Sequence, residues 1–170
     1  MKYKNRKSPR AKWHNYFGAS YFVTINTKDR KHYFGEIKDE NIYLSRIGAY
    51  LKEQIENTKI VRADEIDIPC YTIMPDHVHL IVSFNNCNNQ IDTSDTINTF
   101  GPQRKNLPSV IRGIKSKVKS FANENNIPFE WHGRYYDRII RDCNEMNNIA
   151  DYIENNPIRW EINSNDHLCY

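Results

Sequence analysis

The chain has 170 residues, of which 39% are hydrophobic, and it carries a formal net charge of +3. This length fits a single domain, with enough apolar side chains for one core. No apolar run approaches the roughly 18 residues of a membrane span, and the basic N-terminus lacks the apolar stretch of a secretory signal, so we expect a cytoplasmic protein. The cysteines form no CxxC pair, which argues against a zinc ribbon and a disulfide scaffold.

Positive charge is concentrated in two segments of the chain. Residues 1–14 contain six Lys or Arg and no acidic residue, and residues 96–123 contain six more, again without an acid. Basic segments of this kind are typical of proteins that bind a phosphate backbone. The alternative is a solvated surface that binds nothing, and charge alone slightly favours it.

The first half of the chain predicts a strand, a helix and two more strands. Residues 21–27 alternate between two faces, as a strand does. Residues 43–58 place apolar side chains at helical spacing and predict an amphipathic helix. Residues 66–74 and 77–84 predict two strands that are joined tightly through Pro75 and Asp76.

The second half begins with a polar, Asn-rich segment at about residues 85–106. It is too long for an ordinary connection, so we expect it to be flexible or to contact a substrate. Residues 107–125 predict a second helix and residues 134–141 a fourth strand. Residues 144–157 predict a third helix, which a proline ends.

This order of elements is typical of one fold class. Strand, helix, strand, strand, helix, strand and a further helix match the α+β, ferredoxin-like arrangement, the split βαββαβ pattern that RRM-like domains share. We expect an antiparallel sheet with helices on one face and an additional C-terminal helix. In this topology the strand at residues 77–84 is central.

That central strand carries two histidines, His77 and His79, within the stretch MPDHVHLIV. Side chains alternate along a strand, so both imidazoles are expected on one face, with Val78 and Leu80 on the other beneath the helices. The two imidazoles would lie on the helix-free face, close enough to hold one cation. The alternative is a pair of surface histidines held by hydrogen bonds, because an HxH pattern alone is a weak signal.

A second pair of polar residues lies near the end of the last predicted helix. Tyr152 and Asn156 are four residues apart and therefore project from the same flank. Tyr152 falls beside the apolar stripe rather than within it. Taken singly, such a tyrosine is more often a packing residue and an Asn before Pro is more often a helix stop.

Together, these motifs resemble the single-tyrosine HUH transposases, in particular the REP-associated tyrosine transposases and their insertion-sequence relatives. The stretch YFVTINTKDRKHYFGEI matches the opening strand and loop of that family, and MPDHVHLIV matches its histidine motif. LPSVIRGIKSKVKSFA matches the basic helix, and WHGRYYDRIIRD followed by YIENNPIRW matches the closing signature. Many members have Asn where this chain has Asp76, and the Asn-rich segment is particular to this chain.

The resemblance implies a function and a set of site residues. His77 and His79 would be metal ligands, Asn156 would complete the metal site, and Tyr152 on the C-terminal helix would be the nucleophile. The expected cofactor is a divalent metal, Mg²⁺ or Mn²⁺. The expected activity is cleavage and rejoining of single-stranded or hairpin DNA through a 5′-phosphotyrosine intermediate, by a monomer or a homodimer without a membrane partner.

Further DNA contacts are expected from the second predicted helix. Arg112, Lys115 and Lys119 form a basic row off its apolar stripe and are candidates to bind DNA phosphates. Aromatic side chains could stack on unpaired bases, although core packing is the more common role for most of them. These aromatic residues are Trp13, Trp131, Tyr135 and Tyr136.

Two other functions fit parts of the sequence. One is a nickase of the replication-initiator or relaxase kind, which usually places its histidine pair elsewhere along the chain. The other is a catalytically inactive or domesticated protein that binds nucleic acid on its sheet. The predicted sheet carries histidines in place of the aromatic pair that is typical of RNA-recognition folds.

Overall fold

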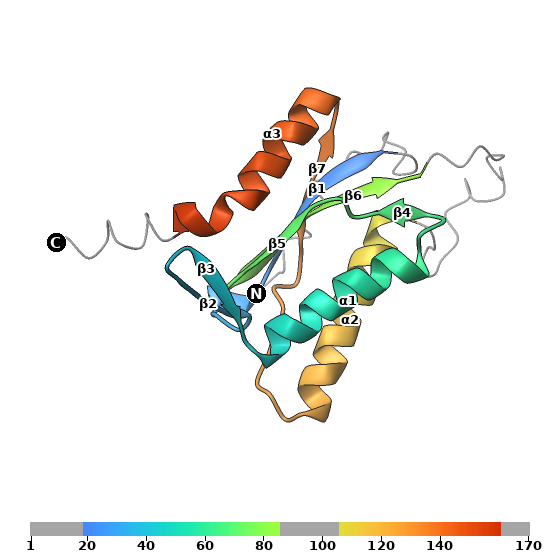
Figure 1. Cartoon of the computed structure of the whole chain (residues 1–170). Coiled ribbons are helices and arrows are strands. Elements are labelled where there is room, and N and C mark those ends of the chain that lie inside the picture. Colours follow the sequence, from blue (N-terminus) through green and yellow to red (C-terminus); the bar gives the residue numbers. More distant parts are fainter. Residues whose placement is uncertain (1–18, 86–105, 161–170) are drawn as a thin grey trace, which may run out of the picture.

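A computed structural model describes residues 19–85 and 106–160 of the chain. One antiparallel sheet lies between two layers of helices, with α1 and α2 on one side and α3 on the other (Figure 1). The predicted basic arm at residues 1–14 and nearly all of the polar segment at about 85–106 lie outside the described residues.

The described residues form seven strands, three α-helices and one short 3-10 helix. Their bounds are β1 Ser20–Asn26, η1 Lys28–Arg30, β2 Gly35–Lys38, β3 Asn41–Leu44, α1 Arg46–Val61, β4 Ile66–Asp67, β5 Tyr71–Met74, β6 His77–Phe84, α2 Leu107–Glu124, β7 Tyr136–Ile140 and α3 Cys143–Glu154. Each of the three α-helices in this list follows a polar N-cap residue, Ser45, Asn106 or Asp142, whose side chain accepts a hydrogen bond from the first turn.

The main sheet confirms the predicted ferredoxin-like topology. Strand β6 is central: β4 and β5 pair with successive parts of one edge, and β1 pairs with the other edge and then with β7. All of these pairings are antiparallel. The register places Thr24 of β1 opposite His79 of β6, and Asn26 opposite His77.

The larger core lies between the sheet and the helices α1 and α2. Alternate side chains of β1 and β6 point into it and are fully buried, which is the pattern that the period of a strand produces. The strands contribute Tyr21, Val23, Ile25, Val78, Leu80 and Val82, and α2 contributes Val110, Ile114 and Val118.

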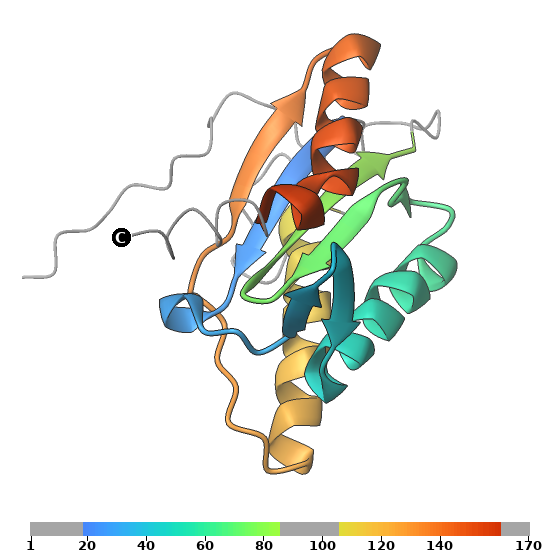
Figure 2. The ribbon, with the colours of Figure 1, turned by 60° about the vertical axis from the view of Figure 1, so that its left-hand side comes forward.

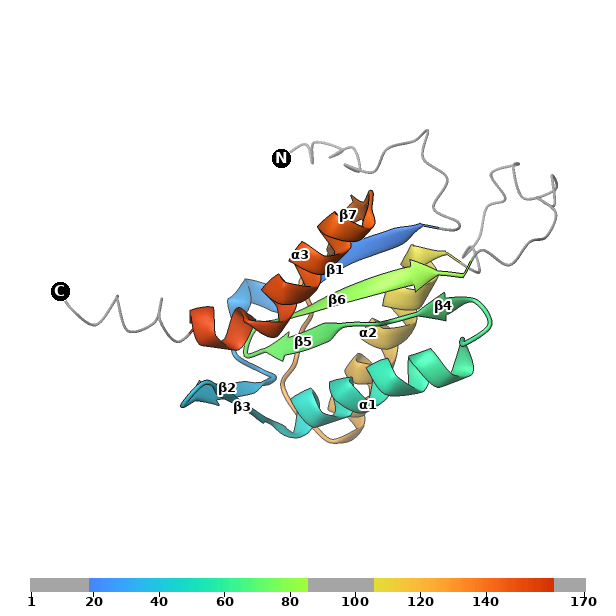
Figure 3. The same ribbon diagram turned by 45° about the horizontal axis from the view of Figure 1, so that its top comes forward.

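The opposite face of the sheet is not free of helices, so this prediction was wrong. Helix α3 lies across it (Figures 2 and 3), and Ile153 packs against Ile81 of β6 and Ile140 of β7. The physical reason is the short connection from β7 to α3. Asp142 caps α3 immediately after β7, so the chain reverses and lays the apolar stripe of the helix on the nearest uncovered apolar side chains.

Two boundaries differ from the predictions, and one hairpin was not predicted. The strand predicted at residues 66–74 is divided into β4 and β5, because Pro69 between them has no N–H for the ladder. The predicted helix at 43–58 begins only after Ser45, since Tyr43 and Leu44 belong to β3. Strands β2 and β3 form a separate hairpin whose turn places Asp39 and Glu40 at positive φ.

The sequence predicted that Pro157 ends the last helix. In the structure, helical backbone continues past this proline. After a turn at Asn155, residues 156–160 are helical again. Pro157 stands at the beginning of this new segment, where a missing N–H leaves no hydrogen bond unmade. The chain therefore continues over the sheet for a further turn beyond Tyr152.

Two further features of residues 19–85 and 106–160 bear on the class of protein. No helix in these two ranges has the length and apolar character needed to cross a membrane. Cys70 and Cys143 are free thiols.

Candidate active site

His77 and His79 are buried neighbours on β6, with 5% of each residue exposed. Their Nε2 atoms lie 3.0 Å apart. Two metal–nitrogen bonds of about 2.1 Å that meet at a right angle would place their nitrogens about 3 Å apart. The spacing of the pair therefore fits two adjacent ligands of a single cation.

The outer nitrogens of both rings have polar partners. His77 Nδ1 lies 2.5 Å from Oδ1 of Asp76, and Arg30 donates from Nε to the other carboxylate oxygen of Asp76 at 2.7 Å. His79 Nδ1 lies 2.8 Å from the hydroxyl of Thr24. These contacts hold the two rings so that their Nε2 atoms face each other.

Burial also decides the charge of His79. Desolvation, followed by repulsion from His77 and Arg30, lowers the pKa of His79 to about 3, against a smaller opposing effect of Asp76. The imidazole is therefore neutral at neutral pH, which is the form that binds a metal ion.

Tyr152 of α3 lies against the histidine pair. Its ring centroid is 5.5 Å from that of His79 and 6.1 Å from that of Phe22, which itself stacks on His79 at 5.2 Å. Tyr152 is 37% exposed. The structure thus brings the predicted nucleophile beside a predicted ligand while part of its side chain remains accessible.

Asn156 belongs to the helical segment that follows α3, and it is buried. It stands four residues after Tyr152, which contacts His79, and four residues before Trp160, whose ring centroid is 5.9 Å from that of His77. Since both flanking residues contact the pair, the buried amide lies on the part of the chain that covers the two imidazoles.

The donors available for a cation are limited. In the described part of the chain, no group of three or more His, Cys, Asp or Glu side chains is arranged to hold a metal ion. Asp76 approaches His77 from the Nδ1 side, away from the point that the two Nε2 atoms face. Asn156 carries an amide oxygen and is a candidate for a third protein ligand.

Four neighbours of the site were not predicted from the sequence as site residues: Thr24, Arg30, Arg159 and Trp160. Thr24 is opposite His79 only because of the strand register, which the sequence does not reveal. The guanidinium of Arg159 lies 5.6 Å from the centroid of the Tyr152 ring. Its spacing of seven residues from Tyr152 is a helical signal, but only if the helix is expected to resume after Pro157.

The basic row of α2 lies elsewhere. Arg112, Lys115 and Lys119 are on a helix that packs against the face of the sheet opposite the histidines. Lys115 donates from Nζ to the carbonyl of His132 at 2.8 Å, and Lys119 donates to the carbonyl of Phe129 at 2.6 Å. Burial lowers the pKa of Lys115. Two of the three cations thus help to hold the segment after α2, and Arg112 is exposed.

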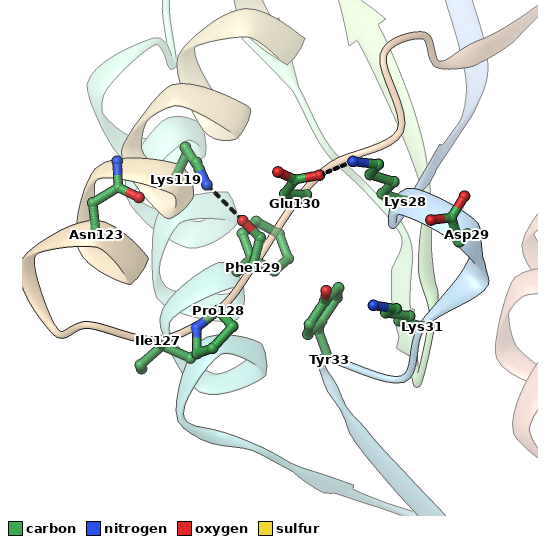
Figure 4. Close-up of a pocket in the computed structure, with 10 residues that line it drawn as sticks. All are labelled: Lys28, Asp29, Lys31, Tyr33, Lys119, Asn123, Ile127, Pro128, Phe129 and Glu130. Carbon is green, nitrogen blue, oxygen red and sulfur yellow. Dashed lines mark hydrogen bonds and ion pairs between the residues drawn. The ribbon is translucent and has the colours of Figure 1, made fainter.

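Lys119 also lines a pocket of about 420 Å³ between the α2–β7 connection and η1. Figure 4 shows Lys31 and Tyr33 on its other wall, and an ion pair between Lys28 and Glu130 at its edge. This pocket adjoins the short 3-10 helix that carries Arg30, and its lining also includes the carboxylates of Asp29 and Glu130.

A comparison with protein families decides the assignment. The family described as "Transposase IS200 like" matches residues 15–156, which include the histidine strand and the tyrosine helix. The chain belongs to the IS200-like transposase family. The resemblance that the motifs had indicated is confirmed.

Individual proteins are also similar to this chain. A Haemophilus influenzae protein named "Uncharacterized protein" is 34% identical over 168 residues, with 92% of this chain and 91% of the relative covered. Another protein of that organism, named "Putative REP-associated tyrosine transposase", is 27% identical over 145 residues, covering 84% and 72%. A solved structure of a REP-associated tyrosine transposase bound to a REP hairpin shares the fold, with a TM-score of 0.56 and 20% identity over 88% of this chain and 74% of that one.

Proposed function

We propose that this IS200-like transposase cleaves and rejoins one strand of single-stranded or hairpin DNA through Tyr152. In this proposal, His77, His79 and Asn156 hold a divalent cation, Mg²⁺ or Mn²⁺. The contact between the Tyr152 ring and His79 carries the proposal, because it places the proposed nucleophile beside a buried pair of imidazoles. The REP hairpin bound by the similar transposase supports a hairpin substrate.

The chemistry requires one bond to form and one to break. The phenolic oxygen of Tyr152 attacks the scissile phosphorus after its proton has been taken up by a base, and the bond from phosphorus to the 3′ oxygen breaks. The products are a 5′-phosphotyrosine and a 3′ hydroxyl. A bound divalent cation would supply positive charge that polarises the phosphate oxygens. Because one phosphodiester replaces another, the reverse reaction rejoins the strand without ATP.

Two arginines beside the site supply further positive charge. Arg159 is exposed and lies over the Tyr152 ring. Arg30 is half-exposed and reaches the histidine pair through Asp76. An arginine guanidinium can bind a phosphate oxygen through two parallel N–H groups, and that of Arg159 lies 5.6 Å from the centre of the Tyr152 ring. We propose that Arg159 contacts the scissile phosphate.

One copy of the chain contains all the proposed site residues. Tyr152 and the histidine pair meet within the same chain, which supports cleavage by a monomer. The rival function, a sheet-based nucleic-acid binder without catalysis, is disfavoured because such proteins use an open sheet face. Here α3 occupies the face that α1 and α2 leave uncovered.

The test is the formation of a covalent protein–DNA adduct. Hairpin oligonucleotides with randomised single-stranded flanks would be incubated with the protein and Mn²⁺ or Mg²⁺, and adducts separated under denaturing conditions. We expect an adduct with the native protein, none with Tyr152→Phe, and none with the double variant His77→Ala and His79→Ala. Tyr43→Phe is the matched control, since Tyr43 is an exposed tyrosine on β3.

Two results would contradict the proposal. An adduct that persists in Tyr152→Phe would show that another residue is the nucleophile. If no protein forms an adduct while all of them bind the hairpins equally well, the non-catalytic function would be favoured.

A further inference from the structure

A row of rings runs through the candidate active site and ends at the surface. Tyr152 lies at its inner end, beside His79, and the ring centroid of His79 is 4.5 Å from that of His77. The Trp160 ring follows at 5.9 Å from His77, and the His32 ring at 5.6 Å from Trp160. Trp160 is partly exposed and His32 is exposed. These last two rings, named the Trp160–His32 pair, are therefore the outer end of the row.

The backbone that carries His32 is held in place on both sides of this residue. His32 lies in the loop between η1 and β2, which packs on the turn between β5 and β6. The N–H of Thr27 donates to the carbonyl of Asp76 at 2.9 Å, and the N–H of Phe34 donates to the carbonyl of Pro75 at 3.0 Å. The Phe34 side chain is fully buried. An exposed ring on such a loop loses little conformational entropy when it binds a ligand.

Trp160 is placed for binding rather than for packing in the core. Of the residues that the structure describes, those that form the two hydrophobic clusters do not include Trp160. Its ring contacts the two imidazoles of His77 and His32 instead. Tryptophan has a large apolar surface, and aromatic side chains that remain partly exposed at a site are typical of residues that contact a ligand.

The ligand that this surface fits is an unpaired nucleobase. Tryptophan and histidine rings both stack on the bases of single strands. An exposed cation directly precedes each ring in the chain, Lys31 before His32 and Arg159 before Trp160. Aromatic rings combined with cations are what single-strand binding proteins use to hold bases and phosphates. Because the Arg159 guanidinium lies over the Tyr152 ring, a phosphate bound there would be next to the row of rings.

We propose that the Trp160–His32 pair stacks an unpaired base of the DNA strand next to the cleaved bond. The position of that bond rests on the proposed function of Tyr152. Every base has a π face, so the pair accepts any base but requires that a base be present. A base within a duplex is already stacked on its neighbours, so the pair favours the single-stranded DNA beside a hairpin over the hairpin stem.

Binding of DNA that lacks a single base tests this pair without cleavage. The Tyr152→Phe protein would be titrated with fluorescent hairpin oligonucleotides that carry one abasic site, placed at successive positions of the unpaired flanks, and binding followed by anisotropy. A base stacked on an aromatic ring contributes a factor of about 5 to 150 in affinity. We expect a loss of this size at one flank position or at two neighbouring ones. Exchange of that base for another should have a much smaller effect.

Variants of the pair connect that loss to these two rings. In Trp160→Ala, the intact oligonucleotide should bind more weakly by a similar factor, and the abasic site should then have no further effect. Trp160→Phe retains a ring and should keep most of the affinity. His32→Ala should reduce the abasic effect, and it removes an exposed side chain, so its result does not depend on the folding of Trp160→Ala. The control is Tyr43→Ala, which removes an exposed ring on β3 and should keep the native pattern.

A role of Trp160 in packing alone predicts a different result. Trp160→Ala would then weaken the binding of intact and abasic oligonucleotides equally, and that outcome would overturn the inference. So would the absence of any sensitive flank position, or of any hairpin binding.

The adduct assay separates this inference from the proposed function. If adducts form but no abasic effect depends on Trp160, the stacking site is refuted and the proposed function stands. If no adduct forms but Trp160→Ala abolishes the abasic effect, the pair binds single-stranded DNA and the proposed cleavage is refuted.

Discussion

The attachment of α3 to the sheet is open to a direct test through Ile153. Its side chain is fully buried and packs in a small cluster with Ile81 and Ile140. Ile153→Ala removes the equivalent of three buried carbons at about 0.8 kcal/mol each. With the residual cavity, the cost should reach about 3 kcal/mol.

The location of the loss determines its effect on function. The cluster around Ile153 is separate from the larger core, so we expect α3 to detach locally and to carry Tyr152 away from His79. A cost of about 3 kcal/mol corresponds to a change of about 150-fold in the docking equilibrium. The rate of adduct formation should fall by up to this factor.

The matched control is Ile114→Ala, which removes a buried isoleucine of α2 from the opposite face of the sheet. It should lower the free energy of unfolding by a similar amount and leave the adduct rate near native at temperatures where the protein is folded. Hydrogen exchange of α3 amides should accelerate only in Ile153→Ala. Equal adduct rates for the two variants, or unchanged exchange in α3, would refute the reasoning.

Three further predictions concern stability and the site. Gly48→Ala should destabilise the protein by about 3 kcal/mol, because the added Cβ would lie 2.0 Å from a backbone oxygen. Gly113→Ala should stabilise it by up to about 1 kcal/mol, because its added Cβ would have no atom within 4 Å. Urea denaturation measures both changes, and equal effects of the two substitutions would contradict this prediction. In the metal-free protein the pKa of His79 is about 3 when folded, against about 6.5 when unfolded, so the unfolded state binds more protons between these values. The free energy of unfolding should therefore fall by about 2 kcal/mol from pH 7 to pH 5, and a native pH dependence in His79→Gln would disprove this cause. Arg159→Ala should slow adduct formation at least about 10-fold, because a positive charge at the phosphate is lost, and Arg159→Lys should have an intermediate rate. An unchanged rate in Arg159→Ala would show that Arg159 is not part of the proposed site.

Much of the fold was predictable because its elements have clear periodicities. Residues of β1 and β6 alternate between faces, and α1 and α2 carry apolar stripes, so strands, helices and their order follow from local pattern. The hairpin of β2 and β3 was missed because its strands are short and mostly polar. Its turn uses Asp39 and Glu40 at positive φ, where glycine or asparagine would have given a recognisable signal.

The candidate site was only partly predictable. The alternation of β6 places His77 and His79 on one face, and helical spacing relates Tyr152 to Asn156, so each pair could be proposed from the chain alone. The network around the imidazoles could not, because Thr24 and Arg30 reach them through strand register and a strained turn.

By itself, the sequence determined which side chains share a face within each element and which motifs place the chain among the transposases. Only the tertiary structure decided that α3 covers the histidine face and brings Tyr152 to His79. The physical reason is that local periodicity orients a side chain relative to its own strand or helix. The contact between two elements depends on burial and on a connection whose direction the local pattern does not encode.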